Sequence, residues 1–155
     1  MRTYGTWLHG DERGSVDREH SAFGSDLLPT NANRTAFDRR RLKHAPMVLD
    51  QSRRALVQNA IEGVATYRAW RLWAINVRTN HVHVVVSADC KPERVMSDFK
   101  AWATRRLREA GLLERDVRPW SDHGSTRYLW NERALEDACK YVVDCQGANL
   151  PEPEA

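Results

Sequence analysis

Residues 71–87 read Arg-Leu-Trp-Ala-Ile-Asn-Val-Arg-Thr-Asn-His-Val-His-Val-Val-Val-Ser, and this stretch decides the fold that the sequence predicts. It contains two runs of β-branched and aromatic residues, 71–77 and 81–87, which are typical of strands. Only Arg78-Thr79-Asn80 separates them, and such a short connection favours an antiparallel hairpin. We therefore expect two neighbouring strands of one sheet.

Helical patterns flank the hairpin on both sides. Before it, Asp50 precedes apolar residues at helical spacing, which predicts a capped amphipathic helix over residues 51–67. After it, residues 93–109 place apolar side chains on one face and basic side chains on the other, and Gly111 can end this helix. A third helix is expected from residue 132 to about residue 146.

Two further strands complete the predicted order. Residues 2–8 alternate and carry β-forming side chains, and residues 125–130 read as a last strand. The resulting order β-α-β-β-α-β is the ferredoxin-like (RRM-like) arrangement, an antiparallel sheet of the α+β class, here with an extra C-terminal helix.

The chain is long enough for one core. Its 155 residues are 41% hydrophobic, so we expect a single domain over residues 1–148. Residues 9–46 show no period and are expected to form a long basic loop, and residues 149–155 a disordered tail.

Composition excludes several classes of protein. No run approaches the roughly 18 consecutive apolar residues of a membrane span, and the N-terminal residues lack the pattern of a secretory signal. We therefore expect a cytoplasmic protein that does not enter a membrane. The three cysteines form an odd set with no CxxC spacing, which argues against a disulfide framework and a structural zinc site.

The basic residues indicate contact with phosphate groups. Of the 24 basic residues 20 are arginine, the side chain that best matches phosphate, while the net charge is only +3. Residues 34–43 and 91–108 are the most basic windows, and a solvated arginine-rich surface explains them equally well. The candidates for DNA contacts are Arg39, Arg40, Arg41, Lys100, Arg105, Arg106 and Arg108.

Two tryptophans flank the expected last strand. Trp120 and Trp130 could stack on unpaired bases of a nucleic acid. Packing in the core is the role that we expect for both, because large aromatic side chains usually bury most of their surface.

The segment that begins Asn80-His81-Val82-His83 is the sharpest chemical feature. The period of two along a strand places His81 and His83 on one face, where both imidazoles can bind one metal ion. Such a pair leaves positions open for a substrate oxygen. The alternative is a chance pair on a partly exposed strand. By ligand type alone, two imidazoles favour zinc or another transition metal.

Four stretches together carry a family resemblance, and they span most of the chain. They are Tyr4-Gly-Thr-Trp-Leu-His-Gly-Asp, Asn80-His-Val-His-Val-Val-Val, Gly124-Ser-Thr-Arg-Tyr-Leu-Trp and Tyr141-Val-Val-Asp-Cys-Gln-Gly. With these stretches the sequence resembles the single-tyrosine transposases of the HUH endonuclease superfamily. That group includes insertion-sequence transposases and REP-associated tyrosine transposases.

The resemblance implies a DNA strand-transfer enzyme. Its nucleophile would be Tyr141, the one of four tyrosines that matches the family's helix, and His81 and His83 would hold Mg²⁺ or Mn²⁺. The tyrosine would attack a phosphodiester of hairpin or palindromic single-stranded DNA and form a 5′-phosphotyrosine link. Both homodimers and monomers occur among such relatives, so a homodimer is an open expectation.

The third metal ligand departs from the family pattern. Relatives usually carry Gln or another polar ligand four residues after the tyrosine, but that position is Cys145 here, and Gln146 follows it. On a regular helix Gln146 lies about 140° from Tyr141. We expect Gln146 as the ligand, with Asp144 or another group as the alternative.

Two other functions remain open on the sequence alone. One is a non-catalytic module that binds single-stranded nucleic acid, because RNA-recognition modules share the sheet plan. The other is an inactive transposase relic, which the displaced Gln146 would favour.

Overall fold

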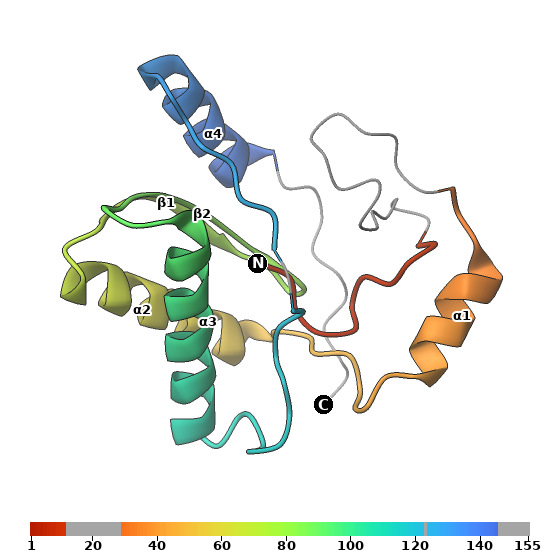
Figure 1. The fold of residues 1–155 in the computed structure, drawn as a ribbon. Helices are drawn as coiled ribbons and strands as arrows, with labels where there is room; N and C mark the ends of the chain where they lie inside the picture. Colours follow the sequence, from red (N-terminus) through yellow and green to blue (C-terminus); the bar gives the residue numbers. More distant parts are fainter. Residues whose placement is uncertain (12–28, 123, 146–155) are drawn as a thin grey trace.

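A computed structural model of the chain describes residues 1–11, 29–122 and 124–145 (Figure 1). Its elements, in chain order, are α1 (Ala32–Arg40), α2 (Gln51–Tyr67), β1 (Arg71–Val77), β2 (Val82–Ser87), α3 (Pro92–Glu109) and α4 (Glu132–Asp144). The α+β class is confirmed. None of the helices in this described part of the chain has the length and apolar character needed to cross a membrane.

The predicted hairpin is present at the centre of the fold. Strands β1 and β2 pair antiparallel, with Asn76 opposite His83 and Val77 opposite Val82. The backbone N–H of Arg78 donates to the carbonyl of His81 at 2.8 Å and closes the connection. The pairing of β1 with β2 therefore determines which of their side chains lie on each face of the sheet.

Helices α2 and α3 form where apolar spacing predicts them. The Asp50 side chain accepts a hydrogen bond from the backbone N–H of Arg53 at 2.8 Å and caps α2. Pro92 occupies the first turn of α3, and Gly111 follows the helix with a φ of +69°, which glycine adopts without strain. Their buried residues lie one helical turn apart: Val57, Ala60, Ile61, Val64, Ala65, Val95, Phe99, Ala103 and Leu107.

The two faces of the sheet are covered by different helices (Figure 1). Val82, Val84 and Val86 pack into the main core with α2 and α3. On the other face, Ala74 and Val85 pack against Val142 of α4. The hairpin is thus the middle layer between α2 and α3 on one side and α4 on the other.

The strand predicted over residues 2–8 is wrong in extent. Only Arg2 and Thr3 pair with the sheet region, as isolated bridges to His81 and Trp120. Gly5 has a φ of +69°, and the Thr6 hydroxyl donates to the Thr3 carbonyl at 3.1 Å, so the chain turns instead of extending. The alternation of side chains did not reveal this turn.

The strand predicted over residues 125–130 is also wrong. The described residues of this segment form no strand, and the position beside Thr3 is taken by Trp120 instead. The segment leaves the sheet edge and leads into α4, while Leu129 packs with the cluster around Val142. Its β-forming side chains therefore build no ladder of hydrogen bonds: Leu129 packs next to α4, and Tyr128 and Trp130 are exposed.

The predicted loop over residues 9–46 contains a helix. Helix α1 begins after Asn31, whose side chain accepts from the backbone N–H of Arg34 at 2.9 Å. None of its residues is buried, so it has no apolar period for a sequence pattern to detect. The rest of this segment that the structure describes lies on either side of α1, and the tail over residues 149–155 falls outside the described residues.

We expect Ile61→Ala to lower the free energy of unfolding by about 2–5 kcal/mol. Ile61 is fully buried between α2 and the rest of the main core, and truncation leaves a cavity there. The matched control is Val143→Ala, because Val143 is 62% exposed; it should change stability by less than about 0.5 kcal/mol. Urea denaturation followed by circular dichroism measures both, and equal losses would contradict the described core.

Candidate active site

Strand β2 and the residue before it carry the two histidines on one side of the sheet. The ring centroids of His81 and His83 are 4.8 Å apart, with an interplanar angle of 87°. His83 faces outward from the main core because Val82 and Val84 on either side of it face inward. The histidine pair therefore follows from the period of two that the sequence shows.

His83 favours its neutral form. Burial, followed by the neighbouring His81, lowers the pKa of His83 from 6.5 to about 4. A neutral imidazole is the form that binds a metal ion or accepts a proton near pH 7.

Asn80 orients the other histidine. Its side-chain oxygen lies 2.7 Å from Nδ1 of His81, and Asn80 is only 5% exposed. Because an amide oxygen accepts, Nδ1 of His81 is the donor, and in the neutral ring the lone pair then lies on Nε2. The sequence reasoning missed this role, although Asn80 immediately precedes the histidine.

The packing of α4 brings Tyr141 to the histidines. Val142 is 4% exposed on the sheet, and the Asn76 side chain donates to its carbonyl at 2.8 Å. The Tyr141 ring lies edge to face with the His83 ring, with centroids 5.9 Å apart. Asn76 was also missed by the sequence reasoning, because only the strand register reveals that it lies opposite His83.

The other three tyrosines have different surroundings. Tyr4 stacks on His44, Tyr67 lies against Trp102, and Tyr128 stacks on Trp130. Tyr141 is 52% exposed, so its ring is in contact with His83 and still accessible to a substrate. Of the four tyrosines, Tyr141 is the one whose ring contacts a histidine of this pair.

The two imidazoles fit a divalent metal ion in protonation and orientation. His83 favours the neutral form, and because His81 donates to Asn80 from Nδ1, its Nε2 is the nitrogen that can bind the ion. Within the residues that the structure describes, no set of three His, Cys, Asp or Glu side chains gathers into a metal cluster. Asp144 is the last residue of α4, and Gln146 lies outside the described residues.

The first group of basic candidates lies on α1. Arg39 and Arg40 form the last turn of the helix and Arg41 is its C-cap residue. All three are exposed, and the guanidinium of Arg41 lies 5.2 Å from the ring centroid of Phe37. These arginines are accessible to a polyanion.

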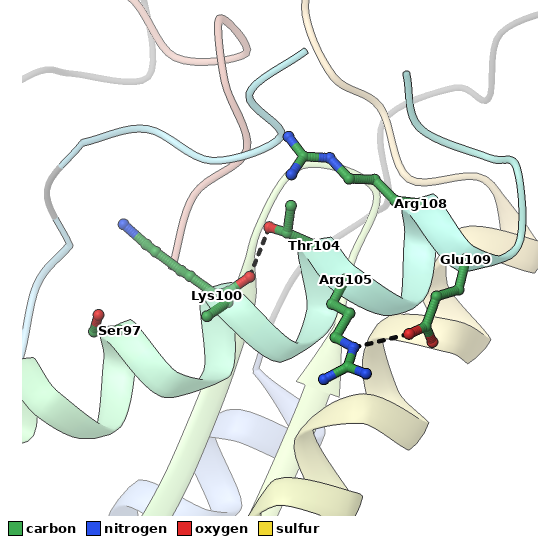
Figure 2. Close-up of a pocket in the computed structure, with 7 residues that line it drawn as sticks. Ser97, Lys100, Thr104, Arg105, Arg108 and Glu109 are labelled. Carbon is green, nitrogen blue, oxygen red and sulfur yellow. Dashed lines mark hydrogen bonds and ion pairs between the residues drawn. The ribbon is translucent and has the colours of Figure 1, made fainter. Parts of the chain in front are cut away.

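The second group lies on α3, where Lys100, Arg105 and Arg108 line a shallow depression of about 580 Å³ (Figure 2). Lys100 donates to the carbonyl of Ser121 at 2.7 Å, and burial lowers its pKa. Arg108 donates to the carbonyl of Arg115 at 2.7 Å. These bonds hold the chain that follows α3 against the helix, so both side chains stabilise the fold as well as being candidates for DNA contact.

Arg105 and Arg106 differ from these two. Both pair with Glu109, at 2.8 Å and 3.1 Å, on the exposed surface of α3. Exposed pairs of this kind are weak, so a phosphate group can compete for either arginine.

The two tryptophans have opposite environments. Trp120 is 6% exposed, and its indole N–H donates to the carbonyl of Lys100 at 3.2 Å, as expected for a core residue. The core role expected for Trp130 is wrong, because Trp130 is 83% exposed. The segment around Trp130 leaves the sheet edge, so nothing in the main core covers its ring.

A family comparison agrees with this geometry. The model of a family described as "Transposase IS200 like" matches residues 41–134, which is more than half of the chain. The chain belongs to the IS200-like transposase family. This confirms the resemblance to single-tyrosine HUH transposases and makes DNA the expected partner. No curated protein and no solved structure shows a significant match.

The matched range of this transposase includes both histidines but ends before Tyr141. The assignment of Tyr141 therefore depends on its contact with His83 and on its position in α4. The family match covers the two histidines, and the packing of α4 independently places Tyr141 on the face of the sheet that carries His83.

We expect His83 to make folding depend on pH in the acidic range. In the unfolded chain the imidazole of residue 83 takes up a proton below about pH 6.5. In the folded protein His83 takes up this proton only near pH 4, so acid favours the unfolded state between these values. The free energy of unfolding should therefore fall as the pH drops through this window. Urea midpoints across the window, for wild type and for His83→Asn, measure the effect. A variant with the same pH slope as wild type would contradict it.

Proposed function

We propose that this transposase nicks and rejoins single-stranded DNA through Tyr141, in a reaction that depends on a divalent metal ion. The single observation that carries the proposal is the edge-to-face contact of Tyr141 with His83, beside His81. A half-exposed tyrosine beside two imidazoles combines a nucleophile with groups that can bind a phosphate-activating metal.

The chemistry assigned to Tyr141 is a transesterification. Its hydroxyl oxygen attacks the phosphorus and gives its proton to solvent, the bond from phosphorus to the 3′ oxygen breaks, and the leaving 3′ oxygen takes up a proton. The products are a 5′-phosphotyrosine link and a strand that ends in a 3′-hydroxyl. Because the number of phosphodiester bonds is conserved, attack by a 3′-hydroxyl on the link reverses the reaction and joins DNA without a nucleotide cofactor.

His81 and His83 would hold Mg²⁺ or Mn²⁺, with Gln146 as the third ligand and Asp144 as the alternative. Bound there, the metal would polarise the scissile phosphate and stabilise charge on the leaving oxygen. Asn80 keeps His81 in one tautomer, and Asn76 holds α4 so that Tyr141 stays beside His83. These two side chains thus orient the groups that act on DNA.

We further propose a ferredoxin-like sheet as the scaffold. The isolated bridges of Arg2 with His81 and of Thr3 with Trp120 support it. They place the N-terminal residues beside β2 and the residues around Trp120 beside the N-terminal residues, with every pair antiparallel. This is the strand order of the ferredoxin-like fold.

As a transposase must reach the DNA that it moves, we also propose that it acts in the cytoplasm.

The expected substrate is a hairpin or palindromic single strand. Exposed arginines on α1 and α3 support binding of its phosphates: Arg39, Arg40, Arg41, Arg105, Arg106 and Arg108, with Lys100 between α3 and the following chain. They lie on elements other than α4, so the phosphates that they bind need not be the one that reacts.

We expect Tyr141→Phe to abolish the covalent protein–DNA adduct, with a loss of at least about 1,000-fold. The variant removes only the attacking oxygen and keeps the ring that contacts His83. Labelled hairpin DNA from the gene's flanks, incubated with Mn²⁺, Mg²⁺ or EDTA and run on a denaturing gel, measures the adduct. The matched control is Tyr67→Phe, because Tyr67 is 72% exposed on α2.

An adduct that survives Tyr141→Phe would reject the assigned nucleophile. Binding of DNA by wild type without any adduct, under every metal, would favour the two other functions. Of these, the inactive relic is supported by the displaced Gln146, and the non-catalytic module by the exposed arginines of α1.

We expect the triple variant R39A/R40A/R41A to reduce the salt dependence of DNA binding. Each lost contact with a single-stranded phosphate lowers the slope of log K against log salt by about 0.7. Fluorescence anisotropy in EDTA, over a series of salt concentrations, measures the slope. The control is Arg94→Ala, because the carboxylate that pairs with Arg94 at 3.2 Å, that of Asp98, is only 14% exposed. An unchanged slope in the triple variant would exclude these arginines from the contact.

A further inference from the structure

Two aromatic rings form an exposed stack just before α4. The ring centroids of Tyr128 and Trp130 are 5.1 Å apart, with an interplanar angle of 20°. Tyr128 is 56% exposed and Trp130 is 83% exposed. An indole with so much of its surface in water contributes little to the core, so folding does not account for this pair.

The local chain geometry explains why the rings face outward. Leu129 lies between the two aromatic residues and is less exposed than either of them. Leu129 packs with the cluster around Val85 and Val142, so Tyr128 and Trp130 point away from it. A partly buried leucine thus holds the stack at a defined place on the surface.

The same helix connects this stack to Tyr141. The Asn131 side chain, which follows Trp130, accepts from the backbone N–H of Ala134 at 2.8 Å and caps α4. From Glu132, the first residue of α4, Tyr141 is about 14 Å along the helix axis at 1.5 Å per residue. This is a distance that a few nucleotides of a single strand can cover.

The charges beside the stack suit a nucleic acid. Arg127 precedes Tyr128, and Arg133 lies in the first turn of α4 after Trp130; both are exposed. Single-stranded DNA binding combines cationic groups on phosphates with aromatic rings on bases, and every base offers a ring face. A flat aromatic pair between two arginines has both parts.

We propose that Tyr128 and Trp130 are a base-stacking platform for single-stranded DNA, a few nucleotides away from the phosphate that reacts. The proposal rests on the proposed function, because it assigns the platform to the DNA strand that Tyr141 attacks. The platform orients unpaired bases without reading their sequence, and the duplex stem of a hairpin does not use it. Tyr128 and Trp130 are positioning residues, since they contact the substrate away from the reacting atoms.

The test uses binding and chemistry as separate readouts. A fluorescein-labelled oligothymidylate is titrated in EDTA against wild type, Trp130→Ala, Tyr128→Ala and Trp130→Phe, and the dissociation constant is read by anisotropy. We expect Trp130→Ala to weaken binding roughly tenfold, and Trp130→Phe to retain most of the affinity because it keeps an aromatic face. Binding of a duplex should not change in any variant.

The matched control is Tyr67→Ala, since Tyr67 is 72% exposed on another helix, and it should bind like wild type. Thermal unfolding of Trp130→Ala should match that of wild type. A loss of affinity in Trp130→Ala and in Tyr128→Ala but not in Tyr67→Ala, with wild-type yield of adduct at saturating hairpin DNA and Mn²⁺, supports the platform.

Three outcomes overturn the inference. If Trp130→Ala binds single strands like wild type, and wild type forms the adduct, the platform is rejected and the proposed function stays intact. An equal loss for single strands and duplex rejects base stacking. If the wild type is a dimer and Trp130→Ala makes it a monomer that binds DNA with unchanged affinity, the two rings form a contact between subunits instead. If wild type forms no adduct but its binding needs Trp130, the platform holds and the proposed chemistry fails.

Discussion

The alternation of side chains along β2 places Val82, Val84 and Val86 against α2 and α3, and His83 and Val85 on the face toward α4. The valines stabilise the strand by burying apolar surface, so the outward direction of His83 follows from the same packing. A shift of one residue in register would turn His83 into the core and valines toward α4. The candidate active site therefore depends on the register of this one hairpin.

Docking of α4 on that face sets a second group of positions. Val142 packs on Ala74 and Val85, and Asn76 binds the carbonyl of Val142, which brings Tyr141 to His83. Leu129 belongs to the same small cluster and holds the chain that enters the helix. One contact region thus positions both the proposed nucleophile and the exposed aromatic pair.

Periodic features of the chain could be predicted from its sequence. The hairpin, α2, α3 and α4 follow from apolar spacing, and the adjacency of His81 and His83 follows from strand geometry. Contacts that depend on register or docking could not be predicted, and these include the roles of Asn76 and Asn80. The strand expected over residues 125–130 and the buried place expected for Trp130 failed for one reason: this segment does not pair in the sheet, so Leu129 packs beside α4 while Trp130 is left exposed.

The most direct test of the account is to identify the amino acid that carries DNA after the reaction. The adduct formed with Mn²⁺ is digested with nuclease and trypsin, and the peptide that retains a nucleotide is sequenced by mass spectrometry. The account predicts a 5′-phosphonucleotide on Tyr141, the tyrosine whose ring contacts His83. A nucleotide on Tyr4, Tyr67 or Tyr128 would contradict the assignment of the site to the contact between α4 and β2.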